Sequence, residues 1–447
     1  MPMIAAARAL AQGHTTSLAL VDQALARIAD PGGEGALAFI KVHPESARAV
    51  ARGMDALRAA GRAPSAFAGI PISVKDLFDE AGEVTAAGSA VLRNAPPARA
   101  TAPCVQRLVR AGMVVLGRTN MTEFAFTGLG VNPHHGTPAS PWDRAARRLP
   151  GGSSSGAGVA VADGMGFAAL GSDTGGSCRI PAALCGVVGW KPTAKRVPLT
   201  GVLPLSASLD SIGPLARSVA DCAVVDALMA GGEDPGAPMP RPLAGLRLGL
   251  PRGTYLTDTM DATVGAVFSR ALTRLSAAGA RIEEFDWPGL ADIQAANATG
   301  GFAVSEAWAW HRALIAEKGP GYDPRILARI MRGEGMRAAD YITLRADRAR
   351  IIAAAAIRTG PFDAIICPTV PVVPPRIADM AEEASYNRTN MLLLRNPSVA
   401  NFLDRCAISL PCHADGEAPV GLMLMGEHDG DAALFAVAAG VEAALQG

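Results

Sequence analysis

The chain has 447 residues and a formal net charge of zero, with 41 acidic and 41 basic side chains. Because no block of basic residues is present, we expect neither nucleic acid nor a membrane surface as its main partner. No apolar run reaches the roughly 18 residues that span a bilayer, and no charged start precedes an apolar core at the N-terminus. These features predict a cytoplasmic protein, with a length typical of two or three domains.

Segments with helical spacing alternate with short Val- and Ile-rich runs along the chain. Two alanine-rich helices near the N-terminus are expected to pack outside the core. Farther along, helices precede strands, which is the order of elements in α/β proteins with a wound sheet. Helices are predicted over residues 5–28, 44–60, 98–111, 219–230, 261–280 and 325–358, and strands over 68–78, 114–117, 246–251 and 364–367.

The glycine-rich stretch 149–181 holds two serine clusters, each opened by a Gly-Gly pair, with Ser153 and Ser177 separated by 24 positions. Glycines at such density indicate positive φ angles or close backbone approach, and loops of this kind present N–H groups to anions. A flexible Gly/Ser linker has a similar composition. However, residues 159–170 between the clusters are small and apolar and predict a buried helix followed by a strand. The second cluster is therefore expected to be a tight turn beside a core element.

Lys75 lies in an unusual setting for a lysine. The chain has only five lysines against 36 arginines, and Lys75 lies inside the apolar run that predicts a strand over 68–78. Burial there would disfavour the ammonium, lower the pKa and leave an amine that can accept a proton. An edge-strand lysine paired with Asp76 or Asp79 is the alternative.

Three segments in this order resemble the amidase signature family of Ser-cisSer-Lys amidohydrolases: residues 69–76 (GIPISVKD), 151–156 (GGSSSG) and 171–182 (GSDTGGSCRIPA). The resemblance covers most of the chain and is strongest over residues 60–230. Further segments that look like the family are 116–124 (LGRTNMTEF), 189–193 (GWKPT), 208–214 (SLDSIGP) and 407–411 (AISLP).

This resemblance implies an α/β fold in which a mixed central β-sheet is flanked by helices on both sides. One large domain is expected over residues 1–447. Within it, residues 1–60 would form N-terminal helices, 60–230 the signature core, and 231–447 the remainder of the sheet and the helices of a substrate funnel.

The resemblance also implies a catalytic triad. Ser177 would be the nucleophile, Ser153, after a cis peptide bond at Gly152–Ser153, the bridging serine, and Lys75 the terminal base. Neutral Lys75 would take a proton from Ser153, which takes one from Ser177, whose oxygen attacks an amide carbonyl. Ser153 would then protonate the leaving nitrogen, and water would clear the acyl-enzyme.

Further members of the site follow from the same resemblance. Asp173 and Arg179 are expected to form a buried ion pair that supports the nucleophile loop, with substrate carboxylate binding by Arg179 as the alternative. Ser154 is a supporting residue, and Ser172 retains a hydroxyl where the family commonly has threonine. The oxyanion hole is expected at the backbone N–H groups of Thr174, Gly175, Gly176 and Ser177.

A rival interpretation comes from residues 152–156, which also match G-x-S-x-G, the nucleophile elbow of α/β-hydrolases, with Ser154 as the nucleophile of an esterase. The elbow needs a preceding strand, and residues 149–150 do not resemble one. It also needs a histidine base, for which the candidates are His311, His413 and His428.

Substrate contacts are expected from the loops around the funnel, at 121–137, 300–345 and 385–405. Apolar candidates for an acyl pocket, which would serve equally well in the core, are Met121, Phe124 and Phe126. One face of a predicted helix carries Tyr341, Arg345 and Arg348, which would suit a carboxylate or ureido group, although a solvated arginine face has the same spacing.

The sequence therefore predicts a hydrolase that cleaves the C–N bond of a small carboxamide and releases ammonia or an amine. The alternatives are an ammonia-releasing subunit of an amidotransferase and a non-catalytic α/β binding protein. The resemblance implies a homodimer.

Two histidine-containing pairs, 134–135 and 412–413, are too few for a metal site, so no metal or cofactor is expected. The seven cysteines form no Cys-x-x-Cys pair and are expected to be reduced and buried.

Overall fold

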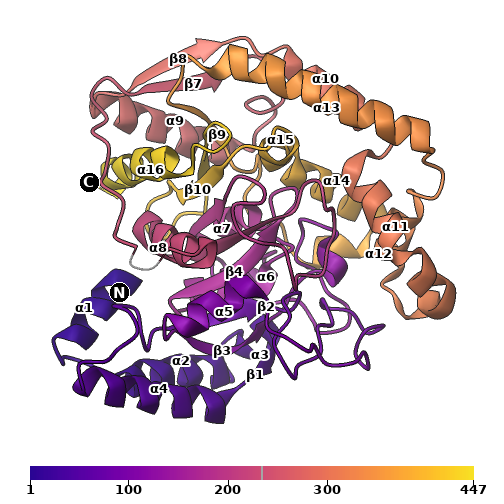
Figure 1. Cartoon of the computed structure of the whole chain (residues 1–447). Helices are drawn as coiled ribbons and strands as arrows, with labels where there is room; N and C mark the ends of the chain where they lie inside the picture. The colour runs from indigo at the N-terminus through magenta and orange to yellow at the C-terminus, as the bar shows by residue number, and fades with distance from the viewer. Residues whose placement is uncertain (233–234, 447) are drawn as a thin grey trace.

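Eleven strands form one sheet within residues 1–232 and 235–446, the ranges that the computed structural model describes (Figure 1). Their order across the sheet is β1-β3-β2-β4-β6-β5-β10-β11-β9-β7-β8. The strands are β1 (Phe39–Val42), β2 (Pro71–Lys75), β3 (Val114–Thr119), β4 (Ala168–Asp173), β5 (Val188–Lys191), β6 (Ser211–Ala216), β7 (Arg247–Pro251), β8 (Arg281–Phe285), β9 (Ala364–Pro368), β10 (Ala407–Pro411) and β11 (Gly421–Met425).

The sheet is mixed, as predicted. β2 pairs in parallel with β3 and β4, and β7 pairs in parallel with β8 and β9, whereas the central strands β4, β6, β5, β10, β11 and β9 pair antiparallel. The helices are α1 (Met3–Ala11), α2 (Ser17–Ala29), α3 (Gly35–Ala38), α4 (Pro44–Ala59), α5 (Pro103–Arg110), α6 (Ser155–Ala162), α7 (Arg179–Cys185), α8 (Val219–Ala230), α9 (Ala262–Ala277), α10 (Gly289–Ala296), α11 (Gly301–Lys318), α12 (Pro324–Met331), α13 (Ala338–Thr359), α14 (Glu383–Arg395), α15 (Pro397–Phe402) and α16 (Asp431–Gln446).

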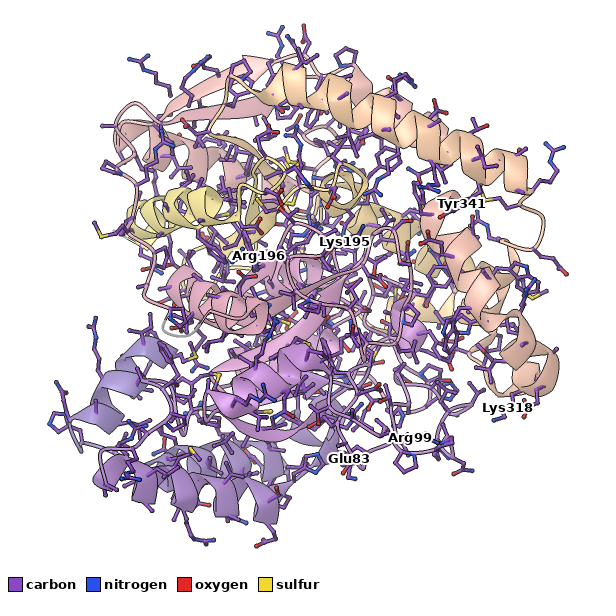
Figure 2. All side chains as sticks on the ribbon, in the orientation of Figure 1. Glu83, Arg99, Lys195, Arg196, Lys318 and Tyr341 are labelled. Carbon is purple, nitrogen blue, oxygen red and sulfur yellow. The ribbon has the colours of Figure 1, made fainter. Side chains whose placement is uncertain are left out.

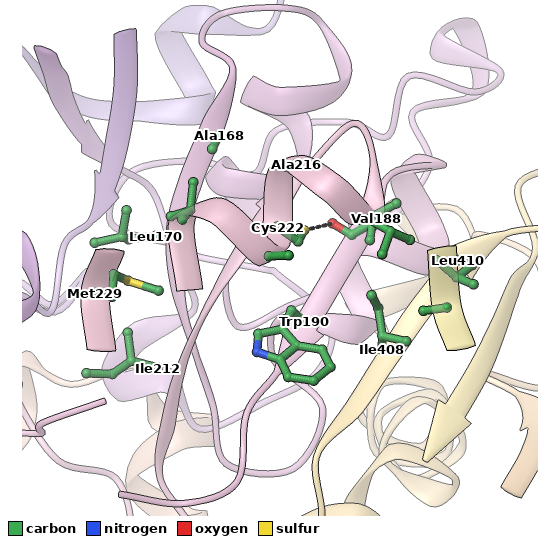
Figure 3. Close-up of a cluster of buried hydrophobic side chains, with 14 of the residues drawn as sticks. Ala168, Leu170, Val188, Trp190, Ile212, Ala216, Cys222, Met229, Ile408 and Leu410 are labelled. Carbon is green, nitrogen blue, oxygen red and sulfur yellow. Dashed lines mark hydrogen bonds between the residues drawn. The ribbon is translucent and has the colours of Figure 1, made fainter. Parts of the chain in front are cut away.

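Helices bury both faces of the sheet. Because successive side chains of a strand point to opposite faces, each buried strand contributes to the two cores on either side. In β9, Ala364 and Ile366 join the core beneath α5, α8, α9 and α16, whereas Ile365 and Cys367 join the core beneath α10, α13 and α15. On this second face α6 and α7 cover the middle of the sheet and α2 and α4 cover the β1 end. Figure 3 shows the centre of the first face, where Trp190 lies among strand residues beside α8.

Two predicted helices are divided in the structure. The helix expected over 5–28 is α1 followed by α2, because Gly13 adopts a φ of 73° and the Thr16 side chain accepts the N–H of Ala19 to begin a new helix. The helix expected over 325–358 is α12 followed by α13, with the break in the glycine-containing segment 332–337. Residues 1–60 also contribute a strand, β1, at the edge of the sheet.

All seven cysteines are buried and free, as expected. Cys178, beside the serine of the second cluster, donates its thiol proton to the carbonyl of Gly213, and burial raises its pKa far above the usual range.

In the described part of the chain, no helix combines the length and the apolar character needed to cross a bilayer.

Strand packing at Gly213 gives a test of this fold. A Cβ at Gly213 would lie 1.9 Å from the backbone oxygen of Trp190, which cannot move aside without separating β5 from β6. We expect Gly213→Ala to lower the melting temperature, since overpacking in a core costs about 1–3 kcal/mol or more.

The matched control is Gly53→Ala on the exposed side of α4, where an added Cβ meets no atom within 4 Å. This change should stabilise the protein by up to about 1 kcal/mol through helix propensity. Differential scanning calorimetry measures both variants, and an unchanged melting temperature for Gly213→Ala would contradict the observed strand spacing.

Candidate active site

Lys75 is the last residue of β2, and strand alternation decides where it points. Ile72 and Val74 lie in the main core, so Ser73 and Lys75 face the opposite side, against α6 and the loop that precedes it. The Lys75 side chain is completely buried there. Its Nζ contacts three hydroxyl groups, Ser153 Oγ at 2.7 Å, Ser154 Oγ at 2.9 Å and Ser172 Oγ at 2.9 Å.

Burial lowers the pKa of Lys75 to about 8, because the charged ammonium is disfavoured away from water. No carboxylate forms an ion pair with Lys75 within the described ranges. A neutral amine has two N–H donors and one lone pair, so three hydroxyl neighbours satisfy it fully. The pocket can therefore hold Lys75 in a form that accepts a proton from a serine hydroxyl.

The backbone brings the two serine clusters together at this amine. The Gly152–Ser153 peptide bond is cis, and the N–H of Ser154 donates to the carbonyl of Ser177 at 3.3 Å. Gly171 makes this approach feasible, because a Cβ there would lie 2.9 Å from both Ser154 Oγ and Cys178 Sγ. Lys75 and Ser153 thus meet directly, and Ser177 lies beside them through the bond from the Ser154 N–H to its carbonyl; the role of the three as a triad stays a prediction.

Asp173 and Arg179 form the expected ion pair, and both side chains are fully buried. Arg179 donates from Nε to Oδ2 at 3.0 Å and from Nη2 to Oδ1 at 2.9 Å, and Asn401 Nδ2 adds a third bond at 2.9 Å. The carboxylate also accepts the N–H groups of Gly176 and Cys178. Burial alone would raise the pKa of Asp173, but pairing with Arg179 lowers it to about 2. The pair therefore fixes the loop on either side of Ser177.

This bonding changes the predicted set of oxyanion donors. The N–H of Gly176 points at Asp173 Oδ1, 2.8 Å away, so it is not free for a ligand. The N–H groups of Thr174, Gly175 and Ser177 donate to no acceptor in residues 1–232 and 235–446. Gly176 is required for a different reason, since its φ is 128° and a Cβ would lie 2.6 Å from Pro397.

Asp210 is a member of the site that we did not predict, although the segment 208–214 contributed to the resemblance. It accepts the Thr174 hydroxyl at 2.5 Å and the N–H groups of Leu205 and Ser206. Burial raises its pKa to about 6. Ser172, Thr174 and Asp210 line a cavity of about 10 Å³, which is the room of a single water molecule.

The apolar candidates for an acyl pocket lie in the core. Met121 and Phe124 are at most 1% exposed and belong to the main hydrophobic cluster. Phe126 is also buried, and the guanidinium of Arg329 stands 5.6 Å from its ring. Ala125, between the two phenylalanines, lines the small cavity beside Thr174.

The polar candidates on α13 are mostly engaged with the protein. Tyr341 points from α13 toward α11, where its hydroxyl donates to Glu306 at 2.6 Å (Figure 2). Arg345 is exposed. Arg348 donates to three backbone carbonyl groups, those of Ser208, Asn401 and Phe402. Arg348 thus anchors α13 to the loop that carries Asp210, and Tyr341 anchors it to α11. Substrate contact by this face stays a prediction.

The strand and the histidine partner that a nucleophile elbow at Ser154 would need are not found beside it in the described residues. Residues 149–150 form no strand, and Ser154 Oγ meets Lys75 and the carbonyl of Ser172 rather than a histidine within the described residues. Of the candidate bases, His311 is buried against the Tyr322 hydroxyl, and burial lowers its pKa to about 4.

Comparison with known proteins agrees with this geometry. The Amidase family model matches residues 19–435. Over 403 residues, 89% of this chain and 86% of the relative, the chain is 39% identical to 2-amino-5-chloromuconic acid deaminase of Comamonas testosteroni. It is 35% identical to a glutamyl-tRNA(Gln) amidotransferase subunit of Chloroflexus aggregans, over 97% of this chain and 94% of that one. A crystal structure of an amidase matches with a TM-score of 0.89 at 31% identity and covers 99% of both chains. The chain therefore belongs to the Amidase family of hydrolases that act on amide carbon–nitrogen bonds.

Proposed function

We propose that the protein hydrolyses a small carboxamide through an acyl-enzyme on Ser177, with Ser153 and Lys75 as its proton relay. The observation that carries this proposal is the buried amine of Lys75, which lies 2.7 Å from Ser153 Oγ and has its pKa lowered to about 8 by burial. A base of this kind suits a serine nucleophile, which is weak until a neighbouring group takes its proton.

In the proposed reaction, Lys75 accepts the proton of Ser153 while Ser153 accepts the proton of Ser177. The Ser177 oxygen bonds to the amide carbonyl carbon, and the negative oxygen that forms is stabilised by the free N–H groups of Thr174, Gly175 and Ser177. Ser153 then protonates the nitrogen as the C–N bond breaks, which releases ammonia or an amine. Water attacks the ester on Ser177 and yields the carboxylic acid.

A second candidate is an ammonia-releasing subunit of an amidotransferase, which the likeness to the Chloroflexus aggregans protein supports. The likeness to the Comamonas testosteroni deaminase supports an enzyme that acts on a small molecule. Ammonia release from glutamine, measured for the isolated chain and after copurification with any second chain, separates the two candidates.

Light scattering of the isolated chain tests the expected homodimer, and cell fractionation tests the expected cytoplasmic location.

Serine substitutions test the relay. Ser177→Ala should abolish both amide hydrolysis and covalent labelling by an acylating inhibitor, because no other hydroxyl becomes acylated. Ser153→Ala should lower turnover by several orders of magnitude yet keep slow labelling, since it removes proton transfer and leaves the nucleophile. Intact-mass spectrometry measures the labelling.

Ser154→Ala is the matched control in this series, because Ser154 Oγ contacts the same amine at 2.9 Å. It should keep far more activity than Ser153→Ala. Labelling that survives Ser177→Ala but is lost in Ser154→Ala would favour the elbow interpretation instead.

The pH dependence of kcat/KM tests the base. Protonated Lys75 cannot accept a proton, so kcat/KM should rise about tenfold per pH unit below pH 8 and level off above it, following the lowered pKa of about 8. Lys75→Met should remove this rise along with most activity.

Lys191→Met provides the control for this profile, because Lys191 is a second buried lysine whose pKa burial also lowers to about 8. Its rate profile should keep the rise that wild type shows. A limb centred near 6.5 that disappears when a histidine is replaced would identify a histidine base and contradict the proposal.

A further inference from the structure

Asp210, immediately before β6, is a buried carboxylate held by neutral donors alone. It is 7% exposed, and it forms no ion pair within residues 1–232 and 235–446. Its Oδ1 accepts the Thr174 hydroxyl at 2.5 Å, and its Oδ2 accepts the N–H groups of Leu205 and Ser206 at 3.0 and 3.1 Å. Buried charges are normally paired, because an isolated charge is costly away from water. Asp210 therefore carries a negative charge that a nearby positive group can balance.

Strand pairing places Asp210 beside the loop that carries Ser177. β4 and β6 pair antiparallel, and the last pair joins Asp173 with Ser211. The Ser211 hydroxyl donates to the carbonyl of Asp173 at 2.8 Å, which fixes the end of this pairing. One step beyond the pair, Asp210 comes opposite Thr174 and accepts its hydroxyl. The sheet therefore determines where this carboxylate lies.

A cavity of about 10 Å³ connects Asp210 with the surroundings of Lys75. Its polar lining comes from Ser172, Thr174, Asp210 and Ser211, and the rest of its wall is apolar. Ser172 belongs to both places, because its Oγ also lies 2.9 Å from Lys75 Nζ. The volume is the room of one water molecule, which needs about two to four polar partners when buried. The hydroxyls and the carboxylate in the wall supply them.

The hydrogen bonds of the charged lysine leave one donor that a water can use. In its ammonium form, Lys75 donates one N–H to each of its three hydroxyl neighbours, of which Ser172 is one. Ser172 Oγ then accepts, and its own O–H has no acceptor among the other residues described. A carboxylate oxygen can accept two hydrogen bonds, and Asp210 Oδ1 accepts one, from Thr174. A water in the cavity can therefore accept from Ser172 and donate to Asp210.

The charge of Asp210 acts on Lys75 in the direction expected of such a link. Burial lowers the pKa of Lys75 to about 8, whereas the negative charges of Asp173 and Asp210 act against this decrease. Asp173 is already balanced by Arg179, 2.9 Å away. Burial raises the pKa of Asp210 to about 6, so its carboxyl group is ionised at the pH at which Lys75 titrates. Asp210 is thus the carboxylate that remains to balance an ammonium on Lys75.

The other ionisable groups packed around this pocket have partners of their own or carry no charge. Glu306, on α11, accepts the Tyr341 hydroxyl at 2.6 Å. Arg348, on α13, donates to three backbone carbonyl groups. The Cys178 thiol is neutral, because burial raises its pKa far above the usual range. None of these groups bonds to Asp210 in the part of the chain that the structure describes.

We propose that Asp210 is a positioning residue of the proton relay, which stabilises the ammonium of Lys75 through one bound water and the hydroxyl of Ser172. The inference rests on the proposed function, since it concerns the base of the same site. Lys75 holds a proton from the time it leaves Ser153 until it returns to protonate the leaving nitrogen. A negative charge fixed nearby stabilises this state in a site away from water, and the water and Ser172 bring that charge to the amine.

Asp210→Asn tests the inference through the titration of Lys75, measured by NMR on protein labelled with carbon-13 at lysine Cε. Without the negative charge the ammonium is less stable, so the pKa of Lys75 should fall by about half a unit or more from the wild-type value. The rise in kcat/KM should move to lower pH by the same amount.

The matched control is Asp226→Asn. Asp226 is also a buried carboxyl group whose pKa burial raises to about 6, but it bonds to Trp190 and pairs with Arg196. It does not line the cavity. Asp226→Asn should therefore leave the pKa of Lys75 within about 0.2 unit of wild type, whatever it does to stability. A Lys75 titration that is equally unmoved in Asp210→Asn would overturn the inference.

Ser172→Ala tests the path between the two groups, because it keeps Asp210 and removes the hydroxyl that joins the water to Lys75. It should lower the pKa of Lys75 as well, and the double variant should show no larger decrease than Asp210→Asn alone. Decreases that add in the double variant would overturn the shared path. If Asp210→Asn does not fold, an unmoved Lys75 in Ser172→Ala is sufficient to overturn the inference. Labelling of Ser177 by an acylating inhibitor tests the proposed function separately, since wild-type protein that does not label would contradict that function alone.

Discussion

The burial of one amine among three serine hydroxyls is the constraint on which the rest of this site depends. Lys75, fully buried at the end of β2, is removed from the water that would stabilise its charge, and its pKa falls to about 8 as a result. The hydroxyls of Ser153, Ser154 and Ser172 satisfy the neutral form as well as the charged one. Lys75 can therefore exchange a proton with Ser153 without breaking any other contact, which is the property that a relay to a serine nucleophile requires.

The loop that carries Ser177, the proposed nucleophile, is held by a buried ion pair. Asp173 accepts backbone N–H groups on both sides of Ser177, its charge is balanced by Arg179, and Asn401 donates a further hydrogen bond to it. Removing one partner of such a buried pair leaves an uncompensated charge and typically costs about 3–5 kcal/mol. The same bonding engages the Gly176 N–H and fixes the loop, which leaves Thr174, Gly175 and Ser177 as the proposed oxyanion donors.

Most of the fold, and the meeting of Lys75 with the first serine cluster, could be predicted because their signals are local. Apolar runs in the sequence identified β2 and β4, and the motifs around Lys75, Ser153 and Ser177 are short continuous segments, 69–76, 151–156 and 171–182. Contacts between distant segments could not be predicted in this way: Asn401 reaches Asp173 across 228 positions, and Tyr341 meets Glu306 on a different helix. Tyr341 and Arg348 lie on one helix, as their spacing predicted. The Arg348 guanidinium, which was expected to suit a substrate group, donates to backbone carbonyls of the protein. The breaks after α1 and α12 were missed because glycine weighs little in a periodicity argument.

The most direct test of this account is the titration of Lys75 itself. Lysine labelled with carbon-13 at Cε gives five NMR signals in this chain, and Lys75→Met and Lys191→Met assign the two buried ones. We expect the Lys75 signal to titrate with a pKa of about 8, at the same pH as the rise in kcat/KM. A Lys75 signal that stays charged up to the ordinary value of about 10.4 would contradict the proton relay and leave Ser177 without its base.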